Sequence, residues 1–254
     1  MQESFETWYL SENDLMQIDV FVCDVKQIDN AKRADILNGL SEYRKSKCLR
    51  FRTDEAQNLS LGAGYLLKNA LAKYGINEMY VEYGFSENGK PYILNFPGIE
   101  FNISHSGSRV LCVSSGDGLT LGCDIEKIRS GKIKVAERFF TKHENEVLSN
   151  LKTDEEKDEM FSRLWTLKES FIKCTGEGLG RAMDSFEFYD IDGEYKVRIK
   201  KENSFTEDDD YGFICLNEIS PLGDIHDPYK YSVCYQKTYL KSEKPVCNIY
   251  KYHL

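Results

Sequence analysis

The stretch W-T-L-K-E-S-F-I-K-C-T-G-E-G-L at residues 165–179 is the part of the sequence around which the rest is organised. It contains no proline, and Leu164, Leu167 and Phe171 recur at helical spacing. This pattern predicts a helix with one stripe facing a core. Gly176 suits a C-terminal cap, so we expect the helix to end there.

A second face of this helix carries charges of both signs. Glu169 and Lys173 lie four residues apart and share this face, and Lys168 adds a further charge beside them. A partly exposed helix with an ordinary Glu–Lys pair would show the same pattern. Charges among aromatic and aliphatic neighbours also suit the wall of a cleft. Because the C-terminal end of a helix repels phosphate, an anion here must be held by side chains or by a metal ion.

The size and charge of the chain limit what it can be. At 254 residues and 41% hydrophobic content, it can bury a core and form one or two domains. A net charge of −9 argues against a general nucleic-acid binder and gives no reason to expect an anionic membrane as partner. No apolar run approaches the roughly 20 residues that span a bilayer, and the N-terminal residues contain no signal-type apolar run.

Cysteine and histidine usage indicates a reduced protein without a zinc site. The eight cysteines show no C-x-x-C spacing, and several lie in apolar runs, where a thiol behaves as a small hydrophobic side chain. The four histidines form no zinc-ligand pattern. We therefore expect a cytoplasmic protein.

A basic segment lies in the helix predicted for residues 41–51. Arg44 and Lys47 are three residues apart and share a face, with Arg50 and Arg52 close by. A solvated basic face is the commoner interpretation of such a run. The functional interpretation is a grip on an anion.

The segment F-N-I-S-H-S at residues 101–106 leads through a glycine into an apolar strand. The adjacent Ser104 and His105 suggest a nucleophile and its base, but in an extended segment successive side chains point to opposite faces. The sequence also lacks a G-x-S-x-G elbow, so we reject a serine hydrolase. His105 is most simply a structural residue, although polar side chains before a glycine equally suit phosphate oxygens.

The run L-T-L-G-C-D-I-E-K-I at residues 119–128 predicts a strand. Asp124 and Glu126 then project from one face, and Cys123 and Ile125 from the other. Two neighbouring carboxylates repel each other unless a cation lies between them. Such a small set of oxygen ligands suits Mg²⁺ bound to substrate phosphates. An exposed strand edge with spare acids would look the same.

The remaining patterns predict alternating helices and strands. The Asn-Gly pair of residues 88–89 predicts a hairpin turn with Lys90 at its tip, where a lysine is more often just solvated. Thr141 and Glu144 have the spacing of a capping box, so we interpret Glu144 as a helix start rather than a catalytic acid. Further helices are predicted at residues 30–37 and 54–74, and further strands at residues 18–25, 79–85, 110–113, 186–189, 196–199, 213–216 and 229–235.

Three motifs together resemble a known family. F-N-I-S-H-S at 101–106, G-C-D-I-E at 122–126 and W-T-L-K-E-S-F-I-K at 165–173 stand in the order and at the separations of the 4′-phosphopantetheinyl transferases of the surfactin-synthetase-activating (Sfp) type. The resemblance covers roughly residues 40–190, with G-K-P at 89–91 and R-F-F-T-K-H-E at 138–144.

The resemblance implies an α+β fold of two similar α/β halves related by a pseudo-twofold, with the active site between them. We expect an N-terminal half at residues 1–117, which grips the coenzyme A nucleotide, and a C-terminal half at residues 118–254, with the metal site and the carrier-docking surface. The implied reaction moves the 4′-phosphopantetheine arm of coenzyme A to a serine of an apo acyl or peptidyl carrier protein and releases adenosine 3′,5′-bisphosphate. A monomer is expected.

The resemblance also implies roles for the candidate residues. Asp124, Glu126 and Glu169 would hold Mg²⁺ on the diphosphate, and Glu169 is the best candidate to accept the serine proton, as ligand first and base second. The phosphate-binding side chains would be Lys168 and Lys173 at the diphosphate, Ser104 and His105 at a phosphate, and Lys90, Arg44 and Lys47 at the phosphates of the nucleotide.

One departure from the family pattern concerns the nucleotide. Members usually carry an Arg in an A-x-x-R-x-L pattern, whereas residues 56–61 here read A-Q-N-L-S-L. The grip must be weaker or come from elsewhere, for example from Arg50 or Arg52. Carrier proteins of this class are typically acidic, so we expect the basic stretch at residues 127–134 to attract one at short range.

Two other functions fit less well. A diphosphate hydrolase usually gathers several glutamates on one helix, whereas here Glu169 is flanked by Lys168 and Lys173. A binding protein that docks carriers without reacting should have lost part of the set Asp124, Glu126, Glu169 and Lys173, and all four are present.

Overall fold

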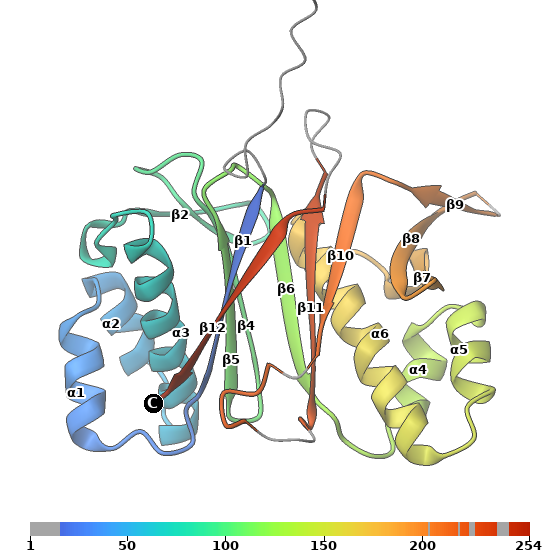
Figure 1. The fold of residues 1–254 in the computed structure, drawn as a ribbon, viewed down its shortest axis with the longest axis horizontal. Coiled ribbons are helices and arrows are strands. Elements are labelled where there is room, and N and C mark those ends of the chain that lie inside the picture. The colour runs from blue at the N-terminus through green and yellow to red at the C-terminus, as the bar shows by residue number, and fades with distance from the viewer. Residues whose placement is uncertain (1–15, 203, 218, 224–226, 238–243) are drawn as a thin grey trace, which may run out of the picture.

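The computed structural model describes residues 16–254 except 203, 218, 224–226 and 238–243 (Figure 1). The helices are α1 (Asn30–Asn38), α2 (Glu42–Leu49), α3 (Asp54–Ala72), α4 (Ile133–Phe139), α5 (Lys142–Ser149) and α6 (Asp154–Thr175), with short 3-10 turns η2 (Glu78–Tyr80), η3 (Gly178–Gly180) and η4 (Met183–Ser185). The strands are β1 (Gln17–Asp24), β2 (Tyr83–Phe85), β3 (Pro91–Ile93), β4 (Glu100–Ser106), β5 (Arg109–Ser115), β6 (Leu121–Lys127), β7 (Phe186–Ile191), β8 (Glu194–Lys201), β9 (Ser204–Asp208), β10 (Tyr211–Leu216), β11 (Tyr229–Gln236) and β12 (Val246–His253).

The two halves of the chain repeat one order of elements. In the first half, three helices follow β1, and the hairpin β4–β5 then returns so that β5 pairs antiparallel with β1. In the second half, three helices follow β6, and after the small sheet β7–β8–β9 the hairpin β10–β11 returns so that β11 pairs antiparallel with β6. Figure 1 shows the strands of the two main sheets in the middle of the molecule, the helices of each half outside them, and the small sheet β7–β8–β9 at the outer side of the second half. The predicted α+β class with two similar halves is confirmed.

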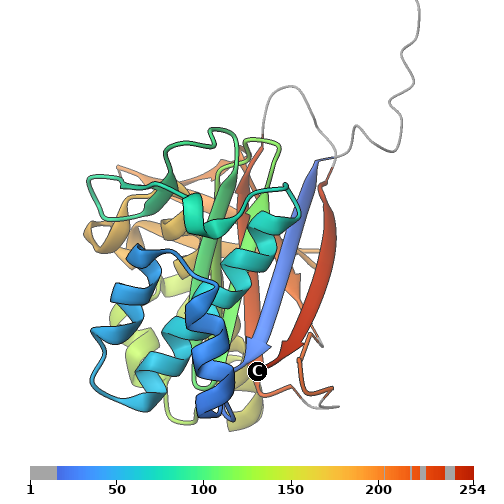
Figure 2. The same ribbon diagram turned by 90° about the vertical axis from the view of Figure 1, so that its left-hand side faces the viewer.

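The core is layered because side chains alternate along strands that are covered on both faces. Ile18 and Val20 of β1 face a core shared with β5, β6 and β11, whereas Phe21 and Cys23 face α3. Figure 2, viewed from the side of the first half, shows α1, α2 and α3 in front of the strands. On the other side, α6 packs over β6 and β11. The order of layers is therefore helices, sheet, sheet, helices.

The long helix α6 is defined by strong signals at both ends. Thr153 and Glu156 form a capping box at its start, and three acidic residues in its first turn complement the positive end of the helix dipole. The charge-rich residues before Leu164 are therefore the first turns of α6. Gly176 ends the helix in the left-handed conformation, with φ 73°, as expected from the sequence.

Three parts of the fold differ from the sequence expectation. The strand expected at residues 79–85 is shorter, because Glu78–Tyr80 forms the turn η2, and β9 lies at residues 204–208, where no strand is predicted from the sequence. The strand β12 lies beyond the last predicted strand and pairs parallel with β1. The last strand of the chain therefore belongs to the sheet of the first half, although our division near Asp117 assigns residues 118–254 to the second.

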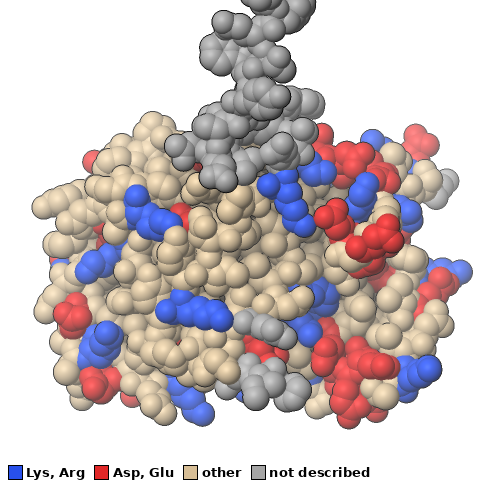
Figure 3. Space-filling model, in the orientation of Figure 1, with Lys and Arg blue, Asp and Glu red and all other residues tan. Residues whose placement is uncertain are grey.

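Among the described residues, no helix combines the length and the apolar character needed to cross a bilayer. On the face drawn in Figure 3, acidic side chains gather over the second half of the molecule. The positive potential of a basic patch would therefore contrast more strongly with its surroundings here than on a neutral protein.

Candidate functional site

The acidic pair of β6 projects from the strand as the sequence predicts. Cys123 and Ile125 are fully buried in the core between the sheets. Asp124 and Glu126 therefore point to the opposite face, where β6 lies beside β4. The Cys123 backbone N–H donates to the side-chain oxygen of Asn102 at 2.9 Å, which ties the two strands together.

A charged cluster joins β6, β4 and α6. Lys173 Nζ lies 2.6 Å from Asp124 Oδ1 and donates to Ser104 Oγ at 2.9 Å. Ser104 Oγ in turn donates to Asp124 Oδ1 at 2.6 Å. Because opposite charge favours the ionised form, Asp124 raises the pKa of the Lys173 ammonium, although burial acts the other way. Ser104 thus contacts the acidic cluster directly.

A glycine brings α6 close enough for this contact. A Cβ atom at Gly122 would lie 2.0 Å from the carbonyl oxygen of Ser170 and 2.3 Å from the backbone nitrogen of Cys174. Only a residue without a side chain can therefore lie under the helix here. The first letter of the motif G-C-D-I-E carried this signal, but sequence reasoning assigned it no role.

The other two acids of the cluster, Glu169 and Glu126, have raised pKa values. Burial raises the pKa of Glu169, and repulsion from Asp124 and Glu126 raises it further. Burial and Asp124 likewise raise the pKa of Glu126, while Ser106 Oγ donates to Glu126 Oε2 at 2.9 Å. The three acids expected as metal ligands therefore lie near enough to influence one another.

The donor set fits a hard divalent cation in its chemistry, although it is not closed around one. Asp124 Oδ2 is buried and has no hydrogen-bond partner, which is costly unless something else satisfies it. Carboxylate oxygens are the ligands that Mg²⁺ prefers. Within the part of the chain that the structure describes, no three His, Cys, Asp or Glu side chains converge tightly enough to hold a metal as they stand. In this structure the ammonium of Lys173 is the cation that lies next to Asp124 Oδ1.

The predicted basic face of α2 lines a cavity of about 260 Å³ in the first half. Arg44 is buried, its guanidinium lies 5.6 Å from the centre of the Tyr83 ring, and its Nε has no hydrogen-bond partner. Burial and the charge of Arg44 lower the pKa of Lys47, so the two cations repel each other. His105 lines the same cavity, and burial, with the charges of Lys173 and Lys47, lowers its pKa. An anion would relieve this repulsion.

Neither of the two arginines considered as replacements for the Arg missing from residues 56–61 lines this cavity. Ala56 and Leu59 line the cavity, which places the expected helix beside it. Arg50 and Arg52 are exposed and do not line it. The positive charge at this cavity comes from Arg44 and Lys47, which both line it.

Lys90 makes backbone contacts that the sequence does not predict. Its Nζ donates to the backbone oxygens of Leu121 at 2.8 Å and Cys174 at 3.4 Å, and Asn88 donates to the Gly176 oxygen at 2.9 Å. The β2–β3 turn therefore ties the first half to the end of α6. It also borders a cavity of about 290 Å³ that Glu169 and Lys173 line from the other side. Lys90 is not among the residues that line the cavity of Arg44.

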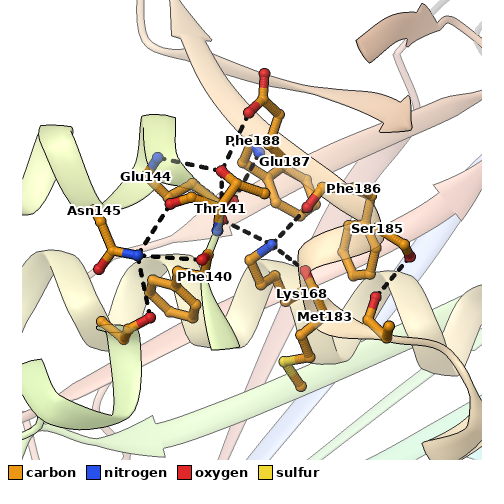
Figure 4. Close-up of polar contacts among 12 residues, drawn as sticks. Phe140, Thr141, Glu144, Asn145, Lys168, Met183, Ser185, Phe186, Glu187 and Phe188 are labelled. Carbon is orange, nitrogen blue, oxygen red and sulfur yellow. Dashed lines mark hydrogen bonds and ion pairs between the residues drawn. The ribbon is translucent and has the colours of Figure 1, made fainter. Parts of the chain in front are cut away.

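Lys168 does not reach the cleft, which corrects its assignment to the diphosphate. Its side chain is fully buried on another side of α6 and pairs with Glu144 at 2.9 Å (Figure 4). The capping box of Thr141 and Glu144 is present as predicted. Glu144 therefore serves as both a helix cap and the partner of Lys168.

The basic stretch at residues 127–134 borders the acidic cluster. Lys127, Arg129 and Lys132 line a cavity of about 190 Å³ together with Glu126 and the aromatic Trp165. This cavity lies beside the cluster, on the side of Glu126. A basic and aromatic wall next to an acidic cluster suits an approaching partner with both acidic and apolar groups.

Comparison with known proteins gives consistent matches. The model of the 4′-phosphopantetheinyl transferase superfamily matches residues 120–227. A 4′-phosphopantetheinyl transferase of Bacillus subtilis is 35% identical over 210 residues, covering 82% of this chain and 80% of that protein. The 4′-phosphopantetheinyl transferase Sfp of Bacillus subtilis strain 168 is 35% identical over 197 residues, covering 77% and 81%. Among solved structures, the holo-[acyl-carrier-protein] synthase of Thermotoga maritima is 20% identical, with a TM-score of 0.36 over 46% of this chain and 62% of that one.

Proposed function

The chain belongs to the 4′-phosphopantetheinyl transferases, and we propose that it moves the phosphopantetheine arm of coenzyme A to a serine of an apo acyl or peptidyl carrier protein. The products are the holo carrier and adenosine 3′,5′-bisphosphate. The observation that carries this proposal is the cluster in which Lys173 meets Asp124 and Ser104 while Asp124 Oδ2 stays without a partner.

The acidic cluster is our candidate for the magnesium site. Asp124, Glu126 and Glu169 would hold Mg²⁺, which when bound neutralises charge on the diphosphate of coenzyme A. Burial raises the pKa of Glu126 and Glu169, and repulsion among the acids raises it further; a cation would relieve that repulsion, which supports this assignment.

Lys173 has two roles in this account. In the protein without substrate it pairs with Asp124, and in the loaded protein its ammonium would turn to the diphosphate oxygens. The reaction is the attack of a serine hydroxyl on the β-phosphorus, with departure of the α-phosphate oxygen. Such transfers depend mainly on positioning and on stabilising charge around phosphorus. An ammonium beside the cluster supplies such charge.

Glu169 is the candidate to accept the serine proton. Its raised pKa makes it a stronger base than an ordinary glutamate. A bound cation would lower that pKa again, so Glu169 acts as ligand first and as base second.

The nucleotide end of coenzyme A would occupy the cavity of the first half. Arg44 and Lys47 would pair with its phosphates, and His105 would donate to a phosphate there. Tyr43 and Tyr83 also line this cavity, with ring centroids 4.9 Å apart. Aromatic walls beside cations suit a ligand that has a flat base and phosphates.

The carrier protein would approach over the basic stretch at residues 127–134. Its serine must reach the cluster, and the cavity of Lys127, Arg129 and Lys132 borders Glu126. A monomer suffices, since one chain contributes both halves. All eight cysteines are free, as suits a cytoplasmic protein.

Intact-mass measurement tests the proposal. Incubation with an apo carrier, coenzyme A and Mg²⁺ should add one phosphopantetheine arm to the carrier. An unmodified carrier, with acyl and peptidyl carriers both tried, would contradict the proposal. Coenzyme A cleavage without carrier modification would indicate a diphosphate hydrolase instead.

A further inference from the structure

The ammonium of Lys168 is a fully used donor in a dry site. It donates to the backbone oxygens of Met183 at 2.8 Å and Phe186 at 2.7 Å, and it pairs with Glu144 Oε2 at 2.9 Å. An ammonium has three hydrogens, so these contacts account for all of them. Lys168 and Glu144 are both 0% exposed.

The carboxylate of Glu144 extends these contacts to two further elements. Glu144 Oε2 accepts the Thr141 backbone N–H at 3.0 Å, which starts α5, and Glu144 Oε1 accepts the Phe188 N–H of β7 at 2.9 Å. Figure 4 shows Lys168 reaching from α6 toward these groups. One ion pair therefore fixes α6 against both the start of α5 and the first strand of the small sheet.

Stability alone is a poor explanation for such a pair. Replacing a buried ion pair by apolar side chains of similar volume is often neutral or stabilising. What the pair adds is a fixed orientation of the Lys168 side chain, because each of these contacts has a defined geometry. The helix α3, which is the counterpart of α6 in the first half, has no charged residue among its buried side chains.

The residues of α6 that follow Lys168 include the two whose side chains must point toward Asp124. Successive residues of a helix point about 100° apart, so the direction of Lys168 fixes that of Glu169. Lys173 lies one turn beyond Glu169 on the same face. We propose that Lys168, held by Glu144, is a positioning residue that sets the rotation of α6 and so places Glu169 and Lys173 against Asp124. This inference rests on the proposed function of that cluster.

The test compares Lys168→Met with a control variant that is destabilised in the other half of the molecule. Leu71→Ala removes a buried side chain of α3 from a core cluster that contains no residue of α6, so it lowers Tm without changing the packing of α6. Both proteins are assayed well below their Tm with coenzyme A, Mg²⁺ and an apo carrier. We expect kcat of Lys168→Met to fall roughly tenfold to a hundredfold, as for small misplacements of reacting groups. The KM for coenzyme A should change less than threefold, because the nucleotide cavity lies in the other half.

A second variant covers the case in which Lys168→Met does not fold. Glu144→Gln keeps the length of the side chain and an oxygen acceptor but removes the charge that holds Lys168. It should lower kcat severalfold, again with little change in KM.

The outcomes separate this inference from the proposed function. If Lys168→Met and Glu144→Gln both keep kcat within twofold of the natural protein, or if Leu71→Ala loses as much as they do, Lys168 has only a structural role. Absence of transfer by the natural protein would instead overturn the proposed function itself.

Discussion

The long helices α3 and α6 occupy matching places in the two halves but bury different side chains. The buried residues of α3 are apolar or small, with Ser60 as the polar one. The buried residues of α6 include Arg163 and Lys168, and its half-buried face carries Glu169 and Lys173. The same scaffold therefore serves packing in one half and charge placement in the other. The difference teaches that function follows from the side chains of a site and not from the topology that carries it.

Each half also lets its long helix approach the sheet in a different way. In the first half the glycine is on the helix, where a Cβ at Gly62 would lie 2.5 Å from the end of the Val25 side chain. In the second half it is on the strand, where a Cβ at Gly122 would meet the backbone of α6. At Gly62 only side chains stand in the way, whereas at Gly122 the backbone of α6 itself would have to move away from β6. Only the second contact therefore fixes the distance between Asp124 and Lys173.

The largest effect should come from the charged face of α6. Glu169→Gln keeps the size of the side chain and removes its charge, so we expect transfer to fall by more than about a hundredfold while the fold persists. Intact mass of the carrier and circular dichroism of the enzyme check these two outcomes. Substantial remaining transfer would rule out both roles that we give to Glu169.

The next largest effect should come from the glycine under α6. Gly122→Ala should push the helix from β6, lowering stability by about 1–3 kcal/mol and kcat roughly a hundredfold. Gly62→Ala is the matched control, which should lower stability but leave kcat nearly unchanged. Thermal unfolding and steady-state kinetics measure both variants. Equal losses of kcat in the two would remove the distinction between the halves.

A smaller effect is expected in the nucleotide cavity of the first half. Arg44→Met should raise the KM for coenzyme A roughly tenfold or more, since hydrogen bonds to charged groups contribute about 1.5–3 kcal/mol. The kcat should change little, because Arg44 lies away from the acidic cluster. A variant with unchanged KM would place the nucleotide elsewhere.

The docking stretch should give a salt-dependent effect. Lys132→Glu with Lys134→Glu should raise the KM for an acidic carrier several-fold at low salt, and less as the Debye length falls to about 10 Å at 0.1 M salt. Lys200→Glu with Lys201→Glu, at the exposed end of β8, changes the net charge equally and serves as control. An unchanged carrier KM at low salt would show that the stretch has no part in docking.

The smallest effect should be the pH dependence of thermal stability, measured without and with Mg²⁺. Raised pKa values of Glu126 and Glu169 mean that the folded protein binds their protons more readily than the unfolded chain does. Their contribution to stability is therefore present below about pH 4, where an unfolded glutamate titrates, and is lost as the pH rises through the raised values. The increase in Tm on adding Mg²⁺ should accordingly grow with pH, and an increase independent of pH would contradict this coupling.

Much of the fold was predictable because its signals are local. The alternation around Asp124, the capping box at Thr141 and the stop at Gly176 are each set by a few neighbouring residues, and the structure has all three. The strand β12 was not predicted, because its pairing with β1 joins opposite ends of the chain. The run V-C-N-I-Y-K-Y-H does contain strand-forming residues in Val246, Ile249, Tyr250 and Tyr252, so a strand was predictable there although its partner was not.

The candidate site was predictable as a set of residues but not as a set of contacts. The motifs placed Glu169 and Lys173 on one face with both near Asp124. They could not show that Lys168 turns the other way, because the choice depends on Glu144, which is distant in sequence. Lys90 likewise finds backbone oxygens that only the folded chain brings together.

The most direct test of the account is a Mn²⁺ titration followed by electron paramagnetic resonance, with coenzyme A present. The account predicts one bound ion per chain in the natural protein, and markedly weaker binding after Asp124→Asn or Glu169→Gln. Lys173→Met should leave the ion bound, since it removes only the cation that competes for Asp124. Unchanged Mn²⁺ binding in both acid variants would show that β6 and α6 do not share a metal. The claim that α6, unlike α3, places charged groups for the reaction would then be contradicted.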